Sequence, residues 1–347
     1  MVMIRALSII ILCILFFSIH AQEQNHATIR GKVLDARTGN PVELTNVYLS
    51  GTTRGSSTDQ NGNFRIDKIP YGNYELVALH IAYQLSVQPV QVKMEDQLYF
   101  TIDLEPKVYE GTAVEVKGED PEEWRRLFKK FKKAFIGTSP NSFDCQLLNP
   151  EVIELKIDDQ SGNLIAWSDS IIILANNALG YTIRLFINDF NWEMYRDSGK
   201  FMVYPIFVEM DTANSDKINE YKRRRLQTYK GSCRHFLATV ANNNLDNEEF
   251  FIGRSQNPGH SPKPIRKSTE LEVLPVQDLS GFFEMSFYNY MIVYYQNHKS
   301  WIKLKTDRLI FDSYGNTSDY GLIKYGDWAK ERMADVLPSD YIPEENY

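Results

Sequence analysis

The sequence predicts an all-β sandwich followed by a larger α+β domain whose strands are mainly antiparallel. Three observations lead to this fold class. Short apolar segments alternate with turn residues over residues 27–106, which is typical of a sandwich. A strongly amphipathic helix then begins near residue 121. Beyond it, helices and strands do not alternate in the way that the βαβ units of a parallel sheet require.

The first residues read as an export signal. Arg5 precedes an apolar run from Ala6 to Ile19, and Ala21 is the small residue before the expected cleavage point. The run of about 14 residues is shorter than the roughly 20 that a membrane-spanning helix needs. We therefore expect residues 1–21 to be a signal peptide and the protein to be exported, with an uncleaved anchor as the alternative. No later segment is apolar enough to span a bilayer.

Turn residues divide the region that follows the leader into short strands. Asp59 and Gly62 suit the first and fourth positions of a type I turn, and Pro70 with Gly72 marks a second turn. The strands expected between such turns cover residues 28–34, 42–49, 63–66, 74–81, 88–92 and 99–104.

This region resembles a known family through several short motifs: Gly31-Lys32-Val33, Gly39-Asn40-Pro41, Thr58 to Phe64, Ile69 to Tyr74 and Leu104-Glu105-Pro106. They are similar to the carboxypeptidase-regulatory-like domain. The resemblance implies a transthyretin-like (prealbumin-like) β-sandwich over residues 27–117, of the kind that precedes other parts of exported proteins in Gram-negative envelopes. It implies an accessory module that stabilises or positions its neighbour, and it does not imply peptidase activity.

The amphipathic helix has clear start and stop signals. Asp120 can cap it, Pro121 fits its first turn, and Gly137 suits its end. Its apolar stripe consists of Trp124, Leu127, Phe128, Phe131 and Phe135. We expect this stripe to dock on a core, and residues 107–119 before the helix to form a last edge strand and a linker.

A second domain is expected over residues 119–341. Its predicted strands are 152–157, 164–167, 171–174, 181–190, 201–208, 249–252, 270–274, 282–287, 290–296, 301–306 and 309–312, and its later helices are 215–230, 232–240 and 327–336. Residues 255–268, rich in proline and glycine, are predicted to be a mobile loop. Motifs such as Asn176 to Tyr181 and Leu337 to Tyr341 resemble an uncharacterised C-terminal region that follows this sandwich in exported bacterial proteins, and that resemblance supplies no activity.

Two cysteines remain after the leader, Cys145 and Cys233. Export exposes them to oxidising conditions, and a disulfide that closes so long a loop would contribute about 4 kcal/mol to stability. Two buried thiols are the alternative. The distance between the Cα atoms decides between them, and the sequence does not determine it.

Six basic residues mark the polar side of the helix that begins at residue 121: Arg125, Arg126, Lys129, Lys130, Lys132 and Lys133. Such a cluster is first of all a solvated helix face, but outside the cytoplasm it also suits an anionic partner such as lipopolysaccharide or a carboxylate-rich protein. A second basic run, from Lys222 to Arg225, surrounds another expected helix. The formal net charge of −7 and the export signal both disfavour nucleic acid as a partner.

The sequence contains no motif for catalysis or metal binding that we can identify. Its six histidines are scattered, and none has the His-Glu-x-x-His spacing of a zinc site. Cys233 and His235 are too close in sequence to be paired as nucleophile and base. Asp59, Asn61 and Gly62 are explained better by a turn than by a calcium loop. We therefore expect no cofactor and no metal ion.

A group of tyrosines allows two interpretations: Tyr288, Tyr290, Tyr294 and Tyr295. Alternating aromatic residues usually pack a sheet, whereas exposed ones beside a groove could stack on sugar rings.

The predicted function is that of a non-catalytic, exported envelope protein that binds or scaffolds a protein or glycan partner. We expect it at the periplasmic or outer-membrane face of a Gram-negative bacterium, with peripheral membrane association compatible with the basic helix. The alternative is a hydrolase, either a peptidase or a glycosidase, whose catalytic groups lie in the C-terminal domain and converge only in three dimensions.

Overall fold

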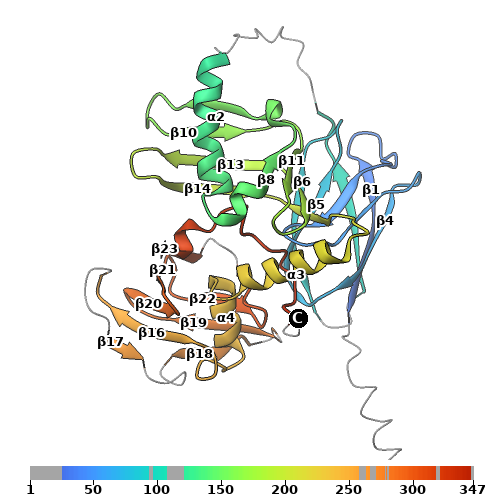
Figure 1. The fold of residues 1–347 in the computed structure, drawn as a ribbon. Helices are drawn as coiled ribbons and strands as arrows, with labels where there is room; N and C mark the ends of the chain where they lie inside the picture. The colour runs from blue at the N-terminus through green and yellow to red at the C-terminus, as the bar shows by residue number, and fades with distance from the viewer. Residues whose placement is uncertain are drawn as a thin grey trace, which may run out of the picture.

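A computed structural model of the protein describes residues 26–93, 97–107, 121–257, 263–265, 271–277, 279, 281–317 and 321–344 (Figure 1). The expected signal peptide and residues 108–119 of the expected edge strand and linker lie outside the described residues. Within the described ranges, no helix is long and apolar enough to cross a membrane.

The described N-terminal strands form two facing sheets. One has the order β4 (Asn63–Ile69), β1 (Ala27–Asp35), β7 (Gln97–Leu104), and the other has the order β3 (Gly55–Ser57), β2 (Asn46–Leu49), β5 (Gly72–Leu79), β6 (Ser86–Val92). Burial alternates along β1, so that Ile29 and Val33 face the core between the sheets. Strands β1 and β7 run parallel, and the other pairs are antiparallel. The predicted β-sandwich is confirmed.

The turn predicted at Asp59 to Gly62 is present in the sandwich. The carboxylate of Asp59 accepts the main-chain N–H groups of Asn61 (2.9 Å) and Asn63 (2.8 Å). Gly62 has φ +75°, and a Cβ atom there would lie 2.5 Å from the carbonyl oxygen of Val33. Glycine is therefore required both by the backbone conformation and by the space.

Helix α2 (Pro121–Ile136) covers one sheet of the second region (Figure 1). That sheet has the order β14 (Ser198–Val203), β13 (Ile187–Glu193), β10 (Leu164–Trp167), β9 (Glu154–Ile157), and a second has the order β15 (Ile206–Glu209), β12 (Tyr181–Leu185), β11 (Ile172–Asn176), β8 (Cys145–Leu147). Leu127, Phe131 and Phe135 of the predicted stripe are buried, and Trp124 and Phe128 pack at its margin. The helix ends at Gly137, whose φ of +99° terminates it as predicted.

A second hydrophobic core lies further along the chain. Helix α3 (Ser215–Tyr229) leads into α4 (Cys233–Ala241), which packs on this core through Phe236 and Leu237. The strands around it form a five-stranded sheet, β17 (Lys263–Ile265), β16 (Phe250–Ser255), β20 (Tyr290–Tyr295), β21 (His298–Leu304), β23 (Leu322–Gly326), and a three-stranded sheet, β18 (Glu272–Pro275), β19 (Phe282–Ser286), β22 (Leu309–Asp312). All described pairs in this region are antiparallel, which confirms the predicted α+β class.

Several details differ from the prediction. The tail helix expected over residues 327–336 is wrong, because only Trp328–Lys330 forms a short 3-10 helix. Beyond it, the N–H groups of Met333 and Ala334 bind the carbonyls of Phe135 and Ile136, so tertiary contacts replace helical hydrogen bonds. The strands expected over 181–190 and over 201–208 are each two strands that lie in different sheets, and the predicted loop 255–268 contains β17.

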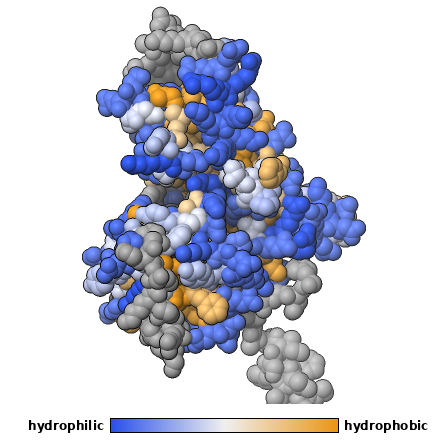
Figure 2. Space-filling model, turned by 60° about the vertical axis from the view of Figure 1, so that its left-hand side comes forward, coloured by the Kyte–Doolittle hydropathy of each residue, from blue (hydrophilic) through white to orange (hydrophobic). Residues whose placement is uncertain are grey.

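The surface is mostly polar. In the space-filling view, hydrophilic residues cover most of the visible face, and hydrophobic residues appear in separate patches on both halves of the molecule (Figure 2). Separate hydrophobic residues of this kind are normal on a folded protein surface.

Candidate functional site

The N-terminal sandwich is joined to the rest of the chain through a built interface. Tyr48, Val77 and Leu79 of the sandwich form a hydrophobic cluster with Tyr204. The Tyr48 hydroxyl donates to the carbonyl oxygen of Tyr204 at 3.0 Å. Thr52 of the sandwich forms a β-bridge with Ile206 of β15. The N–H of Phe207 donates to the carbonyl oxygen of Thr52 at 2.9 Å.

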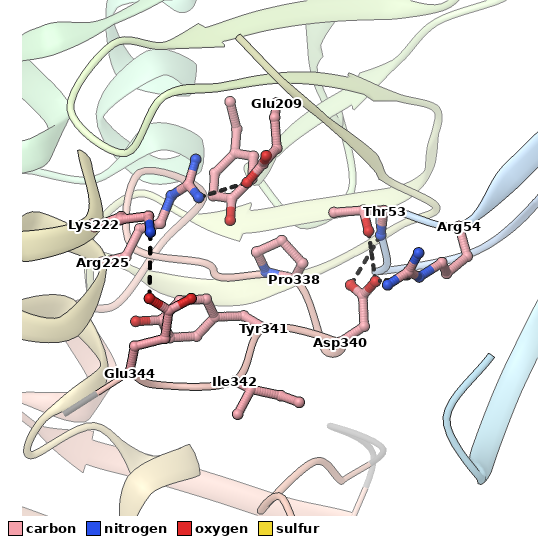
Figure 3. Close-up of a pocket in the computed structure, with 11 residues that line it drawn as sticks. Thr53, Arg54, Glu209, Lys222, Arg225, Pro338, Asp340, Tyr341, Ile342 and Glu344 are labelled. Atoms are coloured by element: carbon pink, nitrogen blue, oxygen red, sulfur yellow. Dashed lines mark hydrogen bonds and ion pairs between the residues drawn. The ribbon is translucent and has the colours of Figure 1, made fainter. Parts of the chain in front are cut away.

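A pocket of ≈ 480 Å³ opens beside this interface (Figure 3). Three parts of the molecule contribute to it: the β2–β3 turn of the sandwich, the β12–β15 sheet with α3, and the C-terminal segment. Its lining residues are Thr53, Arg54, Tyr181, Glu209, Lys222, Arg225, Pro338, Asp340, Tyr341, Ile342 and Glu344. The pocket therefore exists only when all three parts are in place.

Arg225 organises one wall of the pocket. Its side chain is mostly buried, and its Nε and Nη2 donate to the carbonyls of Leu179 (2.7 Å) and Gly180 (3.3 Å). Its Nη1 lies 2.6 Å from the Glu209 carboxylate, and its guanidinium stacks on Tyr181 at 3.9 Å from the ring centroid. All three guanidinium nitrogens and one face of the group therefore have partners within the protein, so Arg225 stabilises this wall of the pocket.

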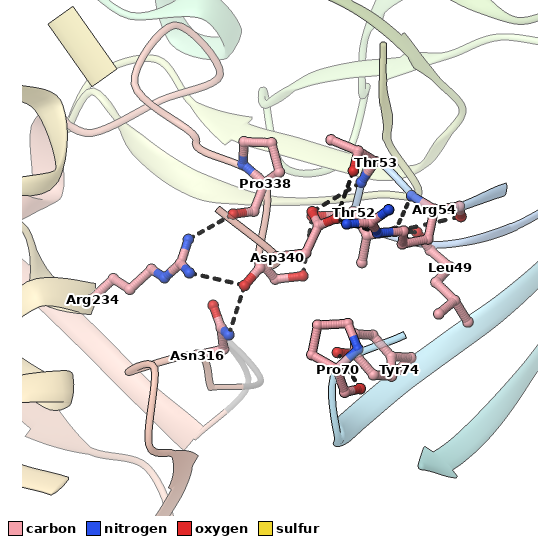
Figure 4. A network of polar contacts seen from close by, with 12 residues as sticks. Leu49, Thr52, Thr53, Arg54, Pro70, Tyr74, Arg234, Asn316, Pro338 and Asp340 are labelled. Carbon is pink, nitrogen blue, oxygen red and sulfur yellow. Dashed lines mark hydrogen bonds and ion pairs between the residues drawn. The ribbon is translucent and has the colours of Figure 1, made fainter. Parts of the chain in front are cut away.

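Asp340 organises the opposite wall (Figure 4). Its side chain is 2% exposed and accepts from the main-chain N–H (3.0 Å) and the hydroxyl (2.5 Å) of Thr53. Its Oδ2 lies 3.0 Å from Arg54 Nε, an ion pair whose angle does not make an aligned hydrogen bond. The neighbouring Ser339 donates its N–H to the Gly51 carbonyl at 2.7 Å. The C-terminal segment is consequently fixed to the sandwich.

Arg234 of α4 holds the same segment from the other side. Its guanidinium is buried and donates to the main-chain carbonyls of Pro338 (2.6 Å), Ser339 (2.8 Å) and Tyr341 (2.7 Å). Burial lowers the pKa of Arg234, while the nearby Asp312 and Asp340 carboxylates act in the opposite direction. The segment from residue 338 to 341 therefore bridges α4 and the sandwich.

The chemistry of the pocket is that of paired charges. Glu209 faces Arg225, Asp340 faces Arg54, and Glu344 lies 3.3 Å from Lys222. Burial raises the pKa of Tyr341 to about 12, so its hydroxyl stays protonated at neutral pH. These pairs hold neighbouring elements of the pocket together.

The six predicted cations of α2 lie on its exposed side, away from the core. Lys133 pairs with Asp197 at 2.8 Å, and Arg126 pairs with Glu123 at 3.1 Å. Lys130 Nζ lies 3.4 Å from the sulfur of Met194. The remaining three have no ion pair among the described residues: Arg125, Lys129 and Lys132.

The second basic run has a different role. Lys222 and Arg225 line the pocket, Arg224 pairs with Asp144 at 2.6 Å, and Arg223 donates to Gln227 at 3.2 Å. Arg223 and Arg224 therefore interact with other side chains of the same protein.

The disulfide considered for Cys145 and Cys233 is not present. Both are buried, reduced thiols, and they belong to different hydrophobic cores, Cys145 beside β11 and Cys233 at the start of α4. Burial raises the pKa of the Cys145 thiol to about 12, and its Sγ donates to the Asn141 carbonyl. The sequence could not reveal that two cores separate the pair.

A metal site needs several ligand side chains that converge on one point. In the described ranges, no group of three histidine, cysteine, aspartate or glutamate side chains could hold an ion. The carboxylate of Asp59 is occupied by the turn described above.

Sequence reasoning missed the residues that build the junction. Arg225 stood within a basic run, Arg234 gave no signal, and Asp340 appeared only inside a motif of unknown meaning. Their roles depend on hydrogen-bond partners 16 to 287 residues away in the chain, which no local pattern encodes.

Comparison with known proteins gives one match to a family model. Residues 29–116 match the model described as CarboxypepD_reg-like domain. No curated protein matches the chain.

Among solved structures, a cohesin–X-dockerin complex from Acetivibrio cellulolyticus is similar at 22% identity and TM-score 0.20, over 22% of this chain and 56% of that chain. BcpA, the major pilin subunit of Bacillus cereus, is similar at 17% identity and TM-score 0.21, over 24% and 31%. A putative carbohydrate binding protein from Bacteroides uniformis is similar at 9% identity and TM-score 0.19, over 82% and 98%. This chain thus spans about half or less of the first two. The observed sandwich agrees with the family match, so residues 29–116 are similar to carboxypeptidase-regulatory-like domains in both sequence and fold.

Proposed function

We propose that this protein is an exported, non-catalytic binding or scaffolding protein of a Gram-negative cell envelope, and that α2 is the surface that contacts an anionic partner. The proposal includes a division into a 27–117 domain and a 119–341 domain. One observation carries it: Arg125, Lys129 and Lys132 are exposed on α2 and have no ion pair among the described residues.

The spacing of these three cations favours a shared contact. They stand at positions i, i+4 and i+7, so they form one line along the helix. The paired cations beside them, such as Lys133 and Arg126, are more than half exposed, and surface pairs of this kind contribute about 0–1 kcal/mol. An anionic partner would therefore gain several charge contacts without breaking a strong internal one.

The opposite face of α2 supports a scaffolding role. Phe131 and Phe135 anchor the helix in the core, with ring centroids 5.0 Å apart. A helix fixed in this way presents its cations in a constant geometry, which lowers the entropy lost on binding. The junction between the sandwich and the second region, with its paired charges, fixes the remainder of the molecule.

Cross-linking in cells tests the proposal. A photoreactive amino acid in place of Lys129 should capture an envelope component, identified by mass spectrometry. The variant R125Q/K129Q/K132Q should bind that component at least about tenfold more weakly, with a smaller dependence on salt. The matched control R30Q/K32Q/K68Q removes the same charge from the sandwich and should bind normally.

Two results would contradict the proposal. One is equal binding of the captured component by both triple variants. The other is turnover of a substrate in a panel of peptides and glycosides by the processed protein, which would favour the hydrolase alternative.

A further inference from the structure

The five-stranded sheet β17-β16-β20-β21-β23 has one face on the core and one face away from it. Met291, Val293 and Tyr295 of β20 belong to the core cluster. Because successive residues of a strand point to opposite faces, Tyr290, Ile292 and Tyr294 lie on the outer face. We call this the aromatic face, made of Phe251, Tyr290, Tyr294, Trp301 and Tyr325 with Lys299 and Lys303.

Strand register brings these residues from four strands together. Tyr294 is opposite Phe251 on β16 and Lys299 on β21. Trp301 is opposite Ile292 on β20 and Tyr325 on β23. Side-chain contacts agree with the register, since the rings of Tyr290 and Tyr325 lie 5.7 Å apart between centroids.

The rings form a continuous apolar layer. Ile292 is fully buried, although it belongs to none of the hydrophobic cores and shares its face with these rings. Its neighbour across β16 is Gly253, which has no side chain to contribute. The tyrosines and Trp301 are half-buried, and Phe251 is 74% exposed at the end of the row. The aromatic rings thus cover Ile292 and still present surface to a ligand.

Two lysines add positive charge to the same face. Lys299 Nζ lies 4.8 Å from the Trp301 ring centroid and 5.4 Å from that of Tyr294. Lys303 Nζ lies 5.5 Å from the Tyr290 ring. The indole N–H of Trp301 has no acceptor among the described residues. In a protein with a net charge of −7, this is a local cationic and aromatic surface.

We propose that the aromatic face binds an acidic polysaccharide. Flat rings stack on the apolar faces of sugar rings, and the two ammonium groups pair with carboxylates or sulfates. Four strands at roughly 4.8 Å spacing make the face about 14 Å wide, so it accommodates more than one sugar. The inference rests on the binding role proposed above and adds the chemical class of a ligand at a second surface.

Binding of polygalacturonate, with neutral dextran for comparison, tests the inference by calorimetry on the processed protein. We expect polygalacturonate to bind and dextran to bind far more weakly. K299Q/K303Q should weaken binding about tenfold, roughly 1.4 kcal/mol. Tyr294→Ala should also weaken it, whereas Tyr195→Ala, which truncates a tyrosine that is 97% exposed elsewhere, should not. Circular dichroism checks that each variant is folded.

The outcomes separate this inference from the proposed function. One outcome would overturn the inference and leave the role of α2 intact: R125Q/K129Q/K132Q loses polygalacturonate binding, while K299Q/K303Q and Tyr294→Ala bind it as the wild-type protein does. Equal binding of dextran, absence of any binding, or a dimer that Tyr294→Ala converts to a monomer would also overturn it. Weaker binding in the aromatic-face variants alone supports it, whatever α2 contacts.

Discussion

Arg234 and Asp340 show how single side chains connect distant parts of this protein. Arg234 donates only to main-chain carbonyls, one of Tyr314 and three of the C-terminal segment, so its hydrogen bonds hold the backbone of that segment in place. Asp340 then extends from that segment to Thr53 and Arg54 of the sandwich. Buried polar groups of this kind cost free energy unless all partners are present, and therefore they specify one arrangement of the parts.

Substitution of Asp340 by alanine should destabilise the protein. The change leaves the N–H and hydroxyl of Thr53 without their acceptor and Arg54 without its counter-charge. We expect a loss of roughly 1–3 kcal/mol in the free energy of unfolding, measured by urea denaturation. Asp159→Ala, at an exposed position, serves as the control and should change stability little. Equal midpoints for the two variants would show that the Asp340 contacts contribute nothing.

His235 should make stability depend on pH. Burial lowers its pKa from 6.5 to about 4, and the neutral ring accepts the Gly231 N–H at Nδ1 (3.0 Å). Nε2 lies 3.6 Å from the Glu248 carboxylate, a contact that favours protonation, but burial and the Nδ1 hydrogen bond both favour the neutral form. Because the pKa is lower in the folded state, the unfolded chain binds the proton first. The stability that neutral His235 contributes to the folded protein is fully present above about pH 6.5 and is lost as the pH falls towards 4.

The measurement compares unfolding free energies at pH 7 and pH 5. We expect the wild-type protein to lose about 2 kcal/mol through this residue. His235→Gln should lose correspondingly less over the same interval. His298→Gln changes an exposed histidine and should keep the wild-type dependence. A wild-type dependence retained by His235→Gln would contradict the assignment.

At the scale of elements, α2 separates its two roles by face. Its apolar face stabilises the fold, and its basic face is available to a partner. Local signals were sufficient to predict this helix, because the capping residues, the stripe and the terminal glycine all lie within its own sequence. The tail after residue 327 also contains helix-forming residues, but contacts with Phe135 and Ile136 override that propensity.

Substitutions on the two faces of α2 should differ greatly in their effect on stability. Phe131 is fully buried against Phe135 and Phe190, so Phe131→Ala should lower the free energy of unfolding by about 3–5 kcal/mol. Lys129→Ala, two residues earlier and exposed, should change it by less than about 0.5 kcal/mol. Thermal and urea unfolding of both variants provide the measurement. A comparable loss in Lys129→Ala would mean that the basic face is structural.

At the scale of the molecule, the C-terminal segment is the bridge among three parts. Ser339 and Asp340 bind the sandwich, Arg234 of α4 and Asn316 bind Ser339, and Tyr341 lies beside Tyr229 of α3. Without these contacts the sandwich would be held by the cluster around Tyr48 and Tyr204, by the short pairing at Thr52, and by Tyr71. The Tyr71 hydroxyl lies 3.1 Å from that of Ser313, and its ring centroid lies 6.0 Å from that of Tyr314.

A chain that stops after Val336 should therefore have a looser sandwich. We expect a larger radius of gyration by small-angle X-ray scattering and faster tryptic cleavage between the two regions. A chain that stops after Glu344 keeps the bridge and should behave like the full chain. If the shorter chain has the same radius and the same cleavage rate, the interface around Tyr48 suffices to hold the sandwich.

The sandwich, the α+β class and the two faces of α2 were predictable from local sequence, because each depends on residues that are neighbours along the chain. The remaining features depend on tertiary contacts. Cys145 and Cys233 lie in two different cores, a segment of turns stands in place of the expected tail helix, and Arg225, Arg234 and Asp340 meet around one junction. The physical reason is that a buried charge or thiol is defined by what packs against it, and those partners come from segments whose approach local patterns do not encode.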